Sequence, residues 1–269
     1  MSLQRRDFVR GAGLASLTLA AGCLGGSKSS DGNPNVVLPE PDRDYTSSDL
    51  PFLAWGQQLP DVTVPAPLED RTVAIRDVKK PRLFTFFYSH CQTVCPVLIS
   101  TLRNVQTHAL NNDYGDQVAF FPITFDPARD DAARLRAYAD EMNVDADAGD
   151  WHFLRPKSEK RARTVITDDF GLNYAKQTSN MGHGTQSPHN GTQASTTSTQ
   201  TTATGTQAID TGTETGTAST GGTTSGNYMF THSALILLAN GDNYVERAYH
   251  GKSPKSEQII ADLKKVRNA

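Results

Sequence analysis

The sequence predicts an α/β domain, because segments with the apolar pattern of buried strands alternate with segments of helical spacing. Residues 82–88 form a nearly continuous apolar run, which is typical of a strand buried on both faces. Pro96 follows shortly afterwards, and proline is favoured at the start of a helix. Late in the chain, Asn240-Gly241 between two apolar runs predicts a hairpin. With 37% hydrophobic residues, the 269-residue chain can bury one substantial core.

Each predicted element has its own pattern. Alternating apolar and polar residues on both sides of residues 69–71 predict a short hairpin, and the run at 82–88 predicts a central strand. After Pro96, apolar side chains recur at helical spacing, at Leu98, Leu102, Val105 and Ala109. The same criteria predict a strand at 118–125, a helix at 130–142, a short strand at 151–154, a helix at 158–170, strands at 229–239 and 244–249, and a helix at 253–266.

The order of these elements narrows the fold class. It reads β-α-β-α, an insertion, then β-β-α, with Cys91 and Cys95 at the first strand–helix junction. That is the order of a thioredoxin-like fold. We therefore expect an α/β, thioredoxin-like domain over residues 50–269, which begins with an N-terminal hairpin.

A compositional change interrupts this domain. From about residue 178 to residue 227 the chain is almost entirely Thr, Gly, Ser, Ala, Gln and Asn. Such a segment cannot offset the entropy of ordering, so we predict a disordered insertion. The strand at 229–239 is too apolar to stand outside the sheet, which argues against a domain boundary. Asn190-Gly191-Thr192 also matches a glycosylation sequon.

The N-terminus has the features of an export signal. Arg5-Arg6 precedes a short apolar stretch at 11–22, which is too short to span a bilayer. Paired arginines in this position resemble a Tat signal, and the residues before Cys23 resemble a lipobox. We therefore predict a Tat-type lipoprotein signal peptide at residues 1–22 and lipidation of Cys23. Two or more acyl chains would hold the protein to the outer face of the cytoplasmic membrane without a spanning helix.

A flexible spacer is expected to separate this anchor from the domain. Residues 23–49 are rich in Gly, Ser, Pro and Asp, as such linkers usually are. The formal net charge of -3, without a basic face, argues against a nucleic-acid partner.

The cysteines indicate metal binding or redox chemistry rather than a structural disulfide. The chain has 3 cysteines, and lipidation of Cys23 leaves Cys91 and Cys95 as thiols in an oxidising compartment. A disulfide between them would close a very small loop and remove little entropy from the unfolded chain, although a structural bridge remains an alternative. Cys95 falls at or beside a helix N-cap, where a thiolate is favoured.

Three motifs together resemble the Sco/SenC family. They are the run FYSHCQTVCP at 87–96, TFDPARD at 124–130 and THS at 231–233. The resemblance covers roughly residues 50–177 and 228–267. It implies a membrane-tethered, thioredoxin-like metallochaperone that binds copper and helps to assemble the CuA site of cytochrome oxidase subunit II. Gln92 stands where many members have proline, which frees a backbone N–H but removes no ligand.

The resemblance also implies that Cys91, Cys95 and His232 are metal ligands. Thiolates select Cu(I), while an imidazole suits Cu(II) as well, so this set can hold both copper states. In a thioredoxin-like sheet, the strand after the insertion neighbours the cysteine-bearing strand. We therefore expect His232, early in that strand, to lie near the two sulfurs.

Other polar residues near the motifs have open roles. Asp126 and Asp130 are expected to orient His232, to meet a partner's charge, or to cap the following helix. His90 is expected to face away from the metal or to support a ligand. The insertion also contains residues that can bind copper, which are Met181, His183 and His189.

Three functions are consistent with these residues. The first is copper delivery by a lipid-anchored protein to the CuA site of subunit II or a related cupredoxin domain. The second is a thiol–disulfide oxidoreductase with Cys91 and Cys95 as catalytic residues, which keeps target cysteines reduced. The CxxxC spacing, and the lack of a proline between Pro188 and Pro254, favour metal binding over general disulfide exchange. The third, a thiol peroxidase, fits the second cysteine poorly.

Overall fold

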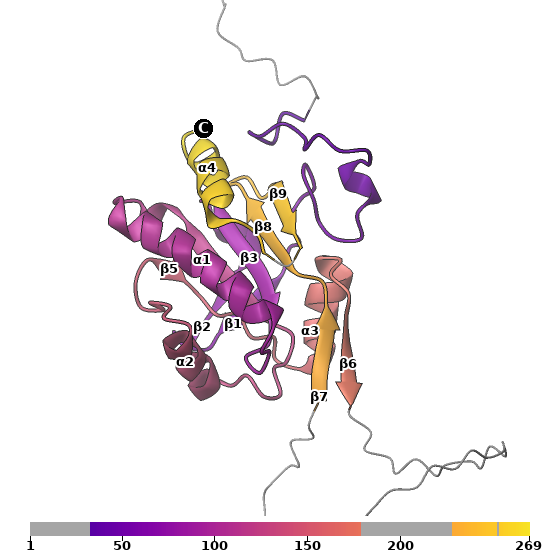
Figure 1. Cartoon of the computed structure of the whole chain (residues 1–269), viewed down its shortest axis with the longest axis vertical. Coiled ribbons are helices and arrows are strands. Elements are labelled where there is room, and N and C mark those ends of the chain that lie inside the picture. The colour runs from indigo at the N-terminus through magenta and orange to yellow at the C-terminus, as the bar shows by residue number, and fades with distance from the viewer. Residues whose placement is uncertain (1–32, 179–227, 252) are drawn as a thin grey trace, which may run out of the picture.

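The computed structural model describes residues 33–178, 228–251 and 253–269 (Figure 1). Its centre is a five-stranded sheet of order β5-β4-β3-β8-β9, in which β3 pairs parallel with β4 and antiparallel with β8. These strands are β3 (Arg82–Phe87), β4 (Ala119–Thr124), β5 (Asp150–Trp151), β8 (Leu235–Ala239) and β9 (Val245–His250). All residues of β3 are buried, as expected for a central strand covered on both faces.

Helices cover this sheet. They are α1 (Val94–Asn111), α2 (Ala132–Glu141), α3 (Glu159–Arg163) with a π-helical continuation (Thr164–Asp169), and α4 (Ser256–Arg267). Short 3₁₀ turns lie at Ser47–Asp49, Ile75–Asp77 and Gly115–Gln117. Helices α1 and α4 lie side by side over one face of the sheet (Figure 1). Within residues 33–178, 228–251 and 253–269, none of the helices is long and apolar enough to cross a membrane.

The predicted class is confirmed by this architecture. The N-terminal hairpin forms from β1 (Thr63–Ala66) and β2 (Arg71–Ala74), which pair antiparallel. The strand, helix and hairpin predictions between residues 82 and 170 and after residue 240 hold, with ends that shift by a few residues. The predicted signal peptide at residues 1–22, Cys23 and residues 179–227 of the predicted insertion, with Met181, His183 and His189, lie outside the described residues.

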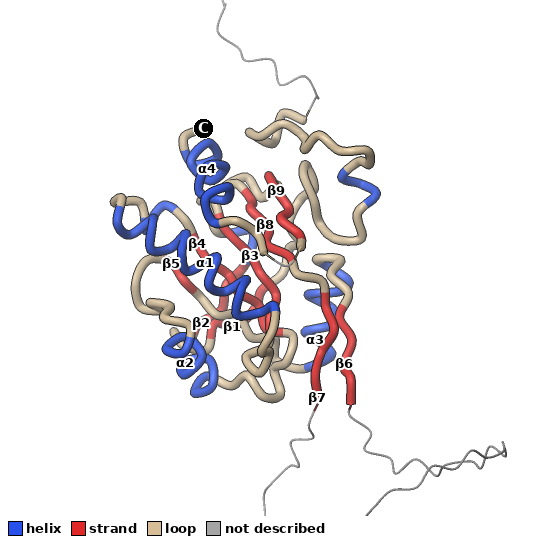
Figure 2. Tube along the Cα trace, in the orientation of Figure 1, coloured by secondary structure: helices blue, strands red, loops and turns tan. Residues whose placement is uncertain are grey.

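The segment predicted as one strand at 229–239 is two strands in different sheets. β7 (Tyr228–His232) pairs antiparallel with β6 (Tyr174–Thr178) in a separate ribbon, which stands beside the central sheet (Figures 1 and 2). Exposed and partly buried residues alternate along β7, whereas all of β8 is buried. The prediction that the whole segment lies inside the sheet was wrong, because only its second half has the continuous apolar pattern of an inner strand.

Part of the predicted spacer is docked on the domain. The carboxylate of Glu246, on β9, is fully buried and accepts hydrogen bonds from the backbone N–H groups of Val37 and Leu38, at 2.9 Å each to its nearer oxygen. Leu38 is buried, and its carbonyl accepts a bond of 2.6 Å from Trp55. The prediction of a flexible spacer over residues 23–49 therefore does not hold around residues 37–38. It stays a prediction for residues 23–32.

Replacing Glu246 with alanine is expected to lower the free energy of unfolding by about 2–4 kcal/mol, because buried N–H donors lose their acceptor. Chemical denaturation monitored by tryptophan fluorescence measures this change, since Trp55 contacts the docked segment. The control is Asp44→Ala, at an exposed acidic residue in the same N-terminal region. Equal stability of the Glu246 variant and the wild type would contradict the anchoring role.

Candidate metal centre

The two cysteines lie where β3 passes into α1. A bond of 3.1 Å from the Cys91 N–H to the Tyr88 carbonyl closes the turn after β3. The helix begins at Val94 with Thr93 as its N-cap, earlier than the predicted start at Pro96. Cys95 is therefore in the first turn, and its N–H donates to the Cys91 Sγ at 3.5 Å, so the helix N-terminus favours negative charge on Cys91. Both cysteines are buried, and both are free thiols.

A histidine from a distant part of the chain completes a group with these thiols. His232 is the last residue of β7, and its Nε2 lies 3.3 Å from the Cys95 Sγ. The ligand atoms of Cys91, Cys95 and His232 all lie within 4.8 Å of one another. Because β8 is paired with β3, the residues just before β8 come to the edge of the sheet at which β3 ends. The structure thus brings together the three residues that the sequence singles out.

The imidazole of His232 is oriented for binding through one nitrogen. Its Nδ1 lies 3.0 Å from the Ser233 carbonyl oxygen and donates to it. That bond selects the tautomer in which Nε2 keeps its lone pair, facing the sulfurs. The ring also packs against Phe125, with 4.8 Å between ring centroids. Metal-binding histidines in proteins are commonly held in this way, by a bond to the second nitrogen.

The two thiols share one proton unequally. A hydrogen bond from the Cys95 thiol is the main cause that lowers the pKa of Cys91 to about 3, and Thr93 adds to it against the cost of burial. The same bond, together with burial, raises the pKa of Cys95 above its usual range. The reduced site therefore holds one thiolate and one thiol at neutral pH. A soft metal ion that replaces the remaining proton would be bound by two thiolates and one imidazole.

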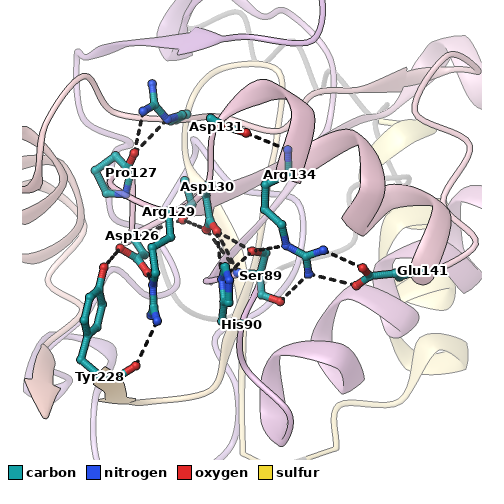
Figure 3. Close-up of polar contacts among 12 residues, drawn as sticks. Ser89, His90, Asp126, Pro127, Arg129, Asp130, Asp131, Arg134, Glu141 and Tyr228 are labelled. Atoms are coloured by element: carbon teal, nitrogen blue, oxygen red, sulfur yellow. Dashed lines mark hydrogen bonds and ion pairs between the residues drawn. The ribbon is translucent and has the colours of Figure 1, made fainter. Parts of the chain in front are cut away.

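Asp126 and Asp130 are both buried. Figure 3 shows the hydrogen bonds that their carboxylates accept. Asp130 accepts from the N–H of Ser89 at 3.2 Å, from its hydroxyl at 2.5 Å, and from the hydroxyl of Thr124. Asp126 accepts from Arg129 at 2.5 Å and from the hydroxyl of Tyr228 at 2.7 Å.

These bonds decide between the roles left open for the two aspartates. The cap of α2 is Asp131, which accepts from the Arg134 N–H at 2.8 Å, so the capping interpretation was wrong for both Asp126 and Asp130. Their bonds in the described part of the chain go to residues other than His232. Any orientation of the imidazole by these carboxylates is therefore indirect.

The sequence does not single out Arg134, which also holds Ser89 in place. Arg134, on α2, donates to the Ser89 hydroxyl at 2.8 Å and to its carbonyl at 2.9 Å, and pairs with Glu141 (Figure 3). His90 lies against the Ser89 hydroxyl at 3.1 Å, with 44% of its side chain exposed. Ser89 and Arg134 are unremarkable in sequence, and only the position of Ser89 two residues before Cys91 signals a role.

A groove of about 770 Å³ opens next to His232. Its wall is formed by the start of α1, the chain around His232 and the end of β9, with the apolar side chains of Phe52, Val94, Val97 and Ala234. Val97 is exposed on this surface. The buried thiols therefore lie close to an open, largely apolar surface.

Comparisons with known proteins agree with this architecture. Residues 70–194 match the model of the SCO1/SenC family, a range that includes both cysteines and ends before His232. A search of curated proteins found no match. Among solved structures, a SCO1/SenC family lipoprotein from Bacillus anthracis is 19% identical, with a TM-score of 0.52, over 80% of this chain and 96% of that chain.

Two further structures are similar. BsSco, described as a member of the Sco family of cytochrome c oxidase assembly proteins, is 16% identical with a TM-score of 0.51, over 81% of this chain and 96% of that chain. ScoI from Bradyrhizobium japonicum, with copper bound, is 20% identical with a TM-score of 0.50, over 78% and 99%. At these identities the likeness shows the fold, which is thioredoxin-like. Over residues 70–194 the chain thus matches the model of the SCO1/SenC family, and its motifs and thioredoxin-like fold agree with that match.

Proposed function

We propose that this protein binds copper through Cys91, Cys95 and His232 and delivers it to the CuA site of cytochrome oxidase subunit II, or to a related cupredoxin domain. The observation that carries the proposal is the convergence of two sulfurs and one imidazole nitrogen within 4.8 Å. Copper is described in ScoI from Bradyrhizobium japonicum, and oxidase assembly is described for the family of BsSco.

The donor set suits a cargo that must be held and then released. Two thiolates bind Cu(I) strongly, and the imidazole extends the set to Cu(II). His232 is partly exposed and borders the groove, so a partner can approach the metal from that side. The apolar wall around Val97 offers a surface on which a partner domain can rest during transfer.

Anaerobic copper titration of the whole protein, with spectroscopy of the bound Cu(II), tests the proposal. We expect close to one copper per chain and an absorption band from sulfur-to-copper charge transfer, because Cys91 and Cys95 supply the ligand atoms. A protein that binds no copper under these conditions, or that binds Cu(II) without such a band, would rule the proposal out.

We also propose that the protein works at the outer face of the cytoplasmic membrane, attached through lipid on Cys23 after removal of residues 1–22. The residues before Cys23 and the paired arginines support this. Cys23→Ala is expected to move the protein from the membrane fraction to the soluble fraction, since lipidation requires the thiol. Unchanged membrane association of that variant would reject the lipid anchor.

A second candidate function is thiol–disulfide exchange with the same partner. The unequal pKa values of the two thiols favour it, because Cys91 is a thiolate that can attack a target disulfide while Cys95 keeps the proton. The target would be reduced as Cys91 and Cys95 form a disulfide. Measuring the reduction potential of the cysteine pair and the turnover with insulin distinguishes this activity from copper binding. Rapid turnover without copper binding would make thiol–disulfide exchange the first candidate function.

A further inference from the structure

The ribbon that carries His232 has little support of its own. β6 and β7 form a two-stranded sheet, and such ribbons are marginally stable in isolation. The two strands are connected through residues 179–227, a length at which the connection cannot set the register as a tight turn does. The position of His232 must therefore depend on contacts between this ribbon and the rest of the domain.

One side of β7 makes those contacts. Tyr228, Phe230 and His232 are the partly buried residues of the strand, while Met229 and Thr231 are exposed. The Phe230 ring packs against Tyr88 and Phe125, with centroids at 5.2 Å and 5.0 Å. These contacts hold the middle of β7, where the Phe230 N–H also donates to the Tyr88 hydroxyl at 3.4 Å, and the Tyr174 ring on β6 stacks on Phe125 at 5.0 Å. They do not include the start of β7 at Tyr228.

The start of β7 is held by a polar group. The Tyr228 hydroxyl donates to Asp126 at 2.7 Å, and Arg129 donates to the Tyr228 carbonyl at 3.2 Å. The Arg129 guanidinium also lies over the Tyr228 ring, 3.6 Å from its centroid, and pairs with Asp126 at 2.5 Å. Figure 3 shows the hydrogen bonds and the ion pair of this group together. Because Asp126 is fully buried, its carboxylate is a rigid attachment point.

The same short segment also holds the cysteine loop. Asp130, four residues after Asp126, binds the N–H and hydroxyl of Ser89, two residues before Cys91. Residues 126–130 therefore touch the loop with the sulfurs on one side and the ribbon with the imidazole on the other (Figure 3).

We propose that Tyr228, Arg129 and Asp126 form a latch that orients His232 toward the two cysteines, and that these three are positioning residues for the metal. His232 lies where β7 joins β8, so a tilt of the ribbon turns the imidazole rather than moving it far. A rotation of the imidazole is enough to weaken metal binding, because only the Nε2 lone pair can bind the metal. The copper part of this inference rests on the proposed function, whereas the latch itself does not.

Tyr228→Phe is the sharpest variant, because it removes one hydroxyl and keeps the ring under Arg129. Without metal, we expect the backbone amides of β7 to exchange hydrogen about tenfold faster than in the wild type, while those of β8 are unchanged. With copper, we expect about tenfold weaker Cu(II) binding and a shifted charge-transfer band. The affinity for Cu(I), which the two thiolates hold, should change less. Arg129→Lys, which lacks the forked guanidinium, should act in the same direction.

The matched control is Tyr45→Phe, at an exposed tyrosine whose ring also lies next to an arginine, Arg43, at 4.9 Å. It should leave exchange and copper binding unchanged. Wild-type exchange of β7 in Tyr228→Phe would overturn the latch, and faster exchange with an unchanged Cu(II) spectrum would overturn its positioning role. A wild-type protein that binds no copper would remove the proposed function instead, while the exchange measurement would still decide the latch.

Discussion

Cys91→Ser and Cys95→Ser are each expected to abolish tight copper binding. Either change replaces a soft thiolate with a hard hydroxyl, so the loss in Cu(I) affinity should exceed the roughly 100-fold cost of losing a residue that only supports a ligand. Competition with a Cu(I) chelator under anaerobic conditions measures the affinity. Both cysteines are buried, and the exchange of sulfur for oxygen keeps the shape of the site, so the variants should remain folded.

His232→Ala is expected to separate the two copper states. Cu(II) should bind much more weakly and lose its charge-transfer spectrum, because a nitrogen ligand is removed, whereas Cu(I) can remain on the two thiolates. His90→Ala is the control, since His90 is adjacent to Cys91 but lies against Ser89. Full Cu(II) affinity in His232→Ala would contradict the three-ligand site, even if the cysteines proved essential.

A large effect on both stability and copper binding is expected from Asp130→Ala. The carboxylate is buried and accepts three bonds from Ser89 and Thr124, so its removal leaves buried donors without an acceptor. We expect the free energy of unfolding to fall by about 2–4 kcal/mol, as measured by chemical denaturation. Copper affinity should fall as well, by about 10–100-fold, because Ser89 directs the loop that carries Cys91.

Asp140→Ala serves as the control for this change, because Asp140 is an exposed carboxylate on α2. Asp130→Asn, which keeps the size of the side chain, should lie between the alanine variant and the wild type. If Asp130→Ala were as stable as the wild type, the bonds to Ser89 would not be stabilising. If it were destabilised but bound copper normally, Asp130 would support the fold without positioning Cys91.

The candidate ligands are predictable from the sequence because their signals are local or belong to a recognisable motif. The apolar run before Cys91 and the helix start after it place both thiols at a strand–helix junction, and the structure has them there. His232 stands in the last of the three motifs that carry the family resemblance. The strands and helices follow from periodicity, which depends on residues close together in the chain.

The surroundings of the site required the tertiary structure. The pattern of residues 229–239 does not reveal that β7 leaves the sheet to pair with β6, since those strands are separated by residues 179–227. In the same way, Glu246 lies far along the chain from the segment that it anchors at Val37 and Leu38. The hydropathy pattern does not indicate which distant backbone N–H groups will donate hydrogen bonds to a buried carboxylate.

The sequence by itself therefore determined which atoms are available to hold a metal, because residue identity and local spacing decide ligand chemistry. Only the tertiary structure decided how those atoms are aimed. Buried carboxylates need hydrogen-bond donors, and Asp126 and Asp130 are buried. Their donors include Tyr228 and Ser89, which belong to the two segments that carry the candidate ligands.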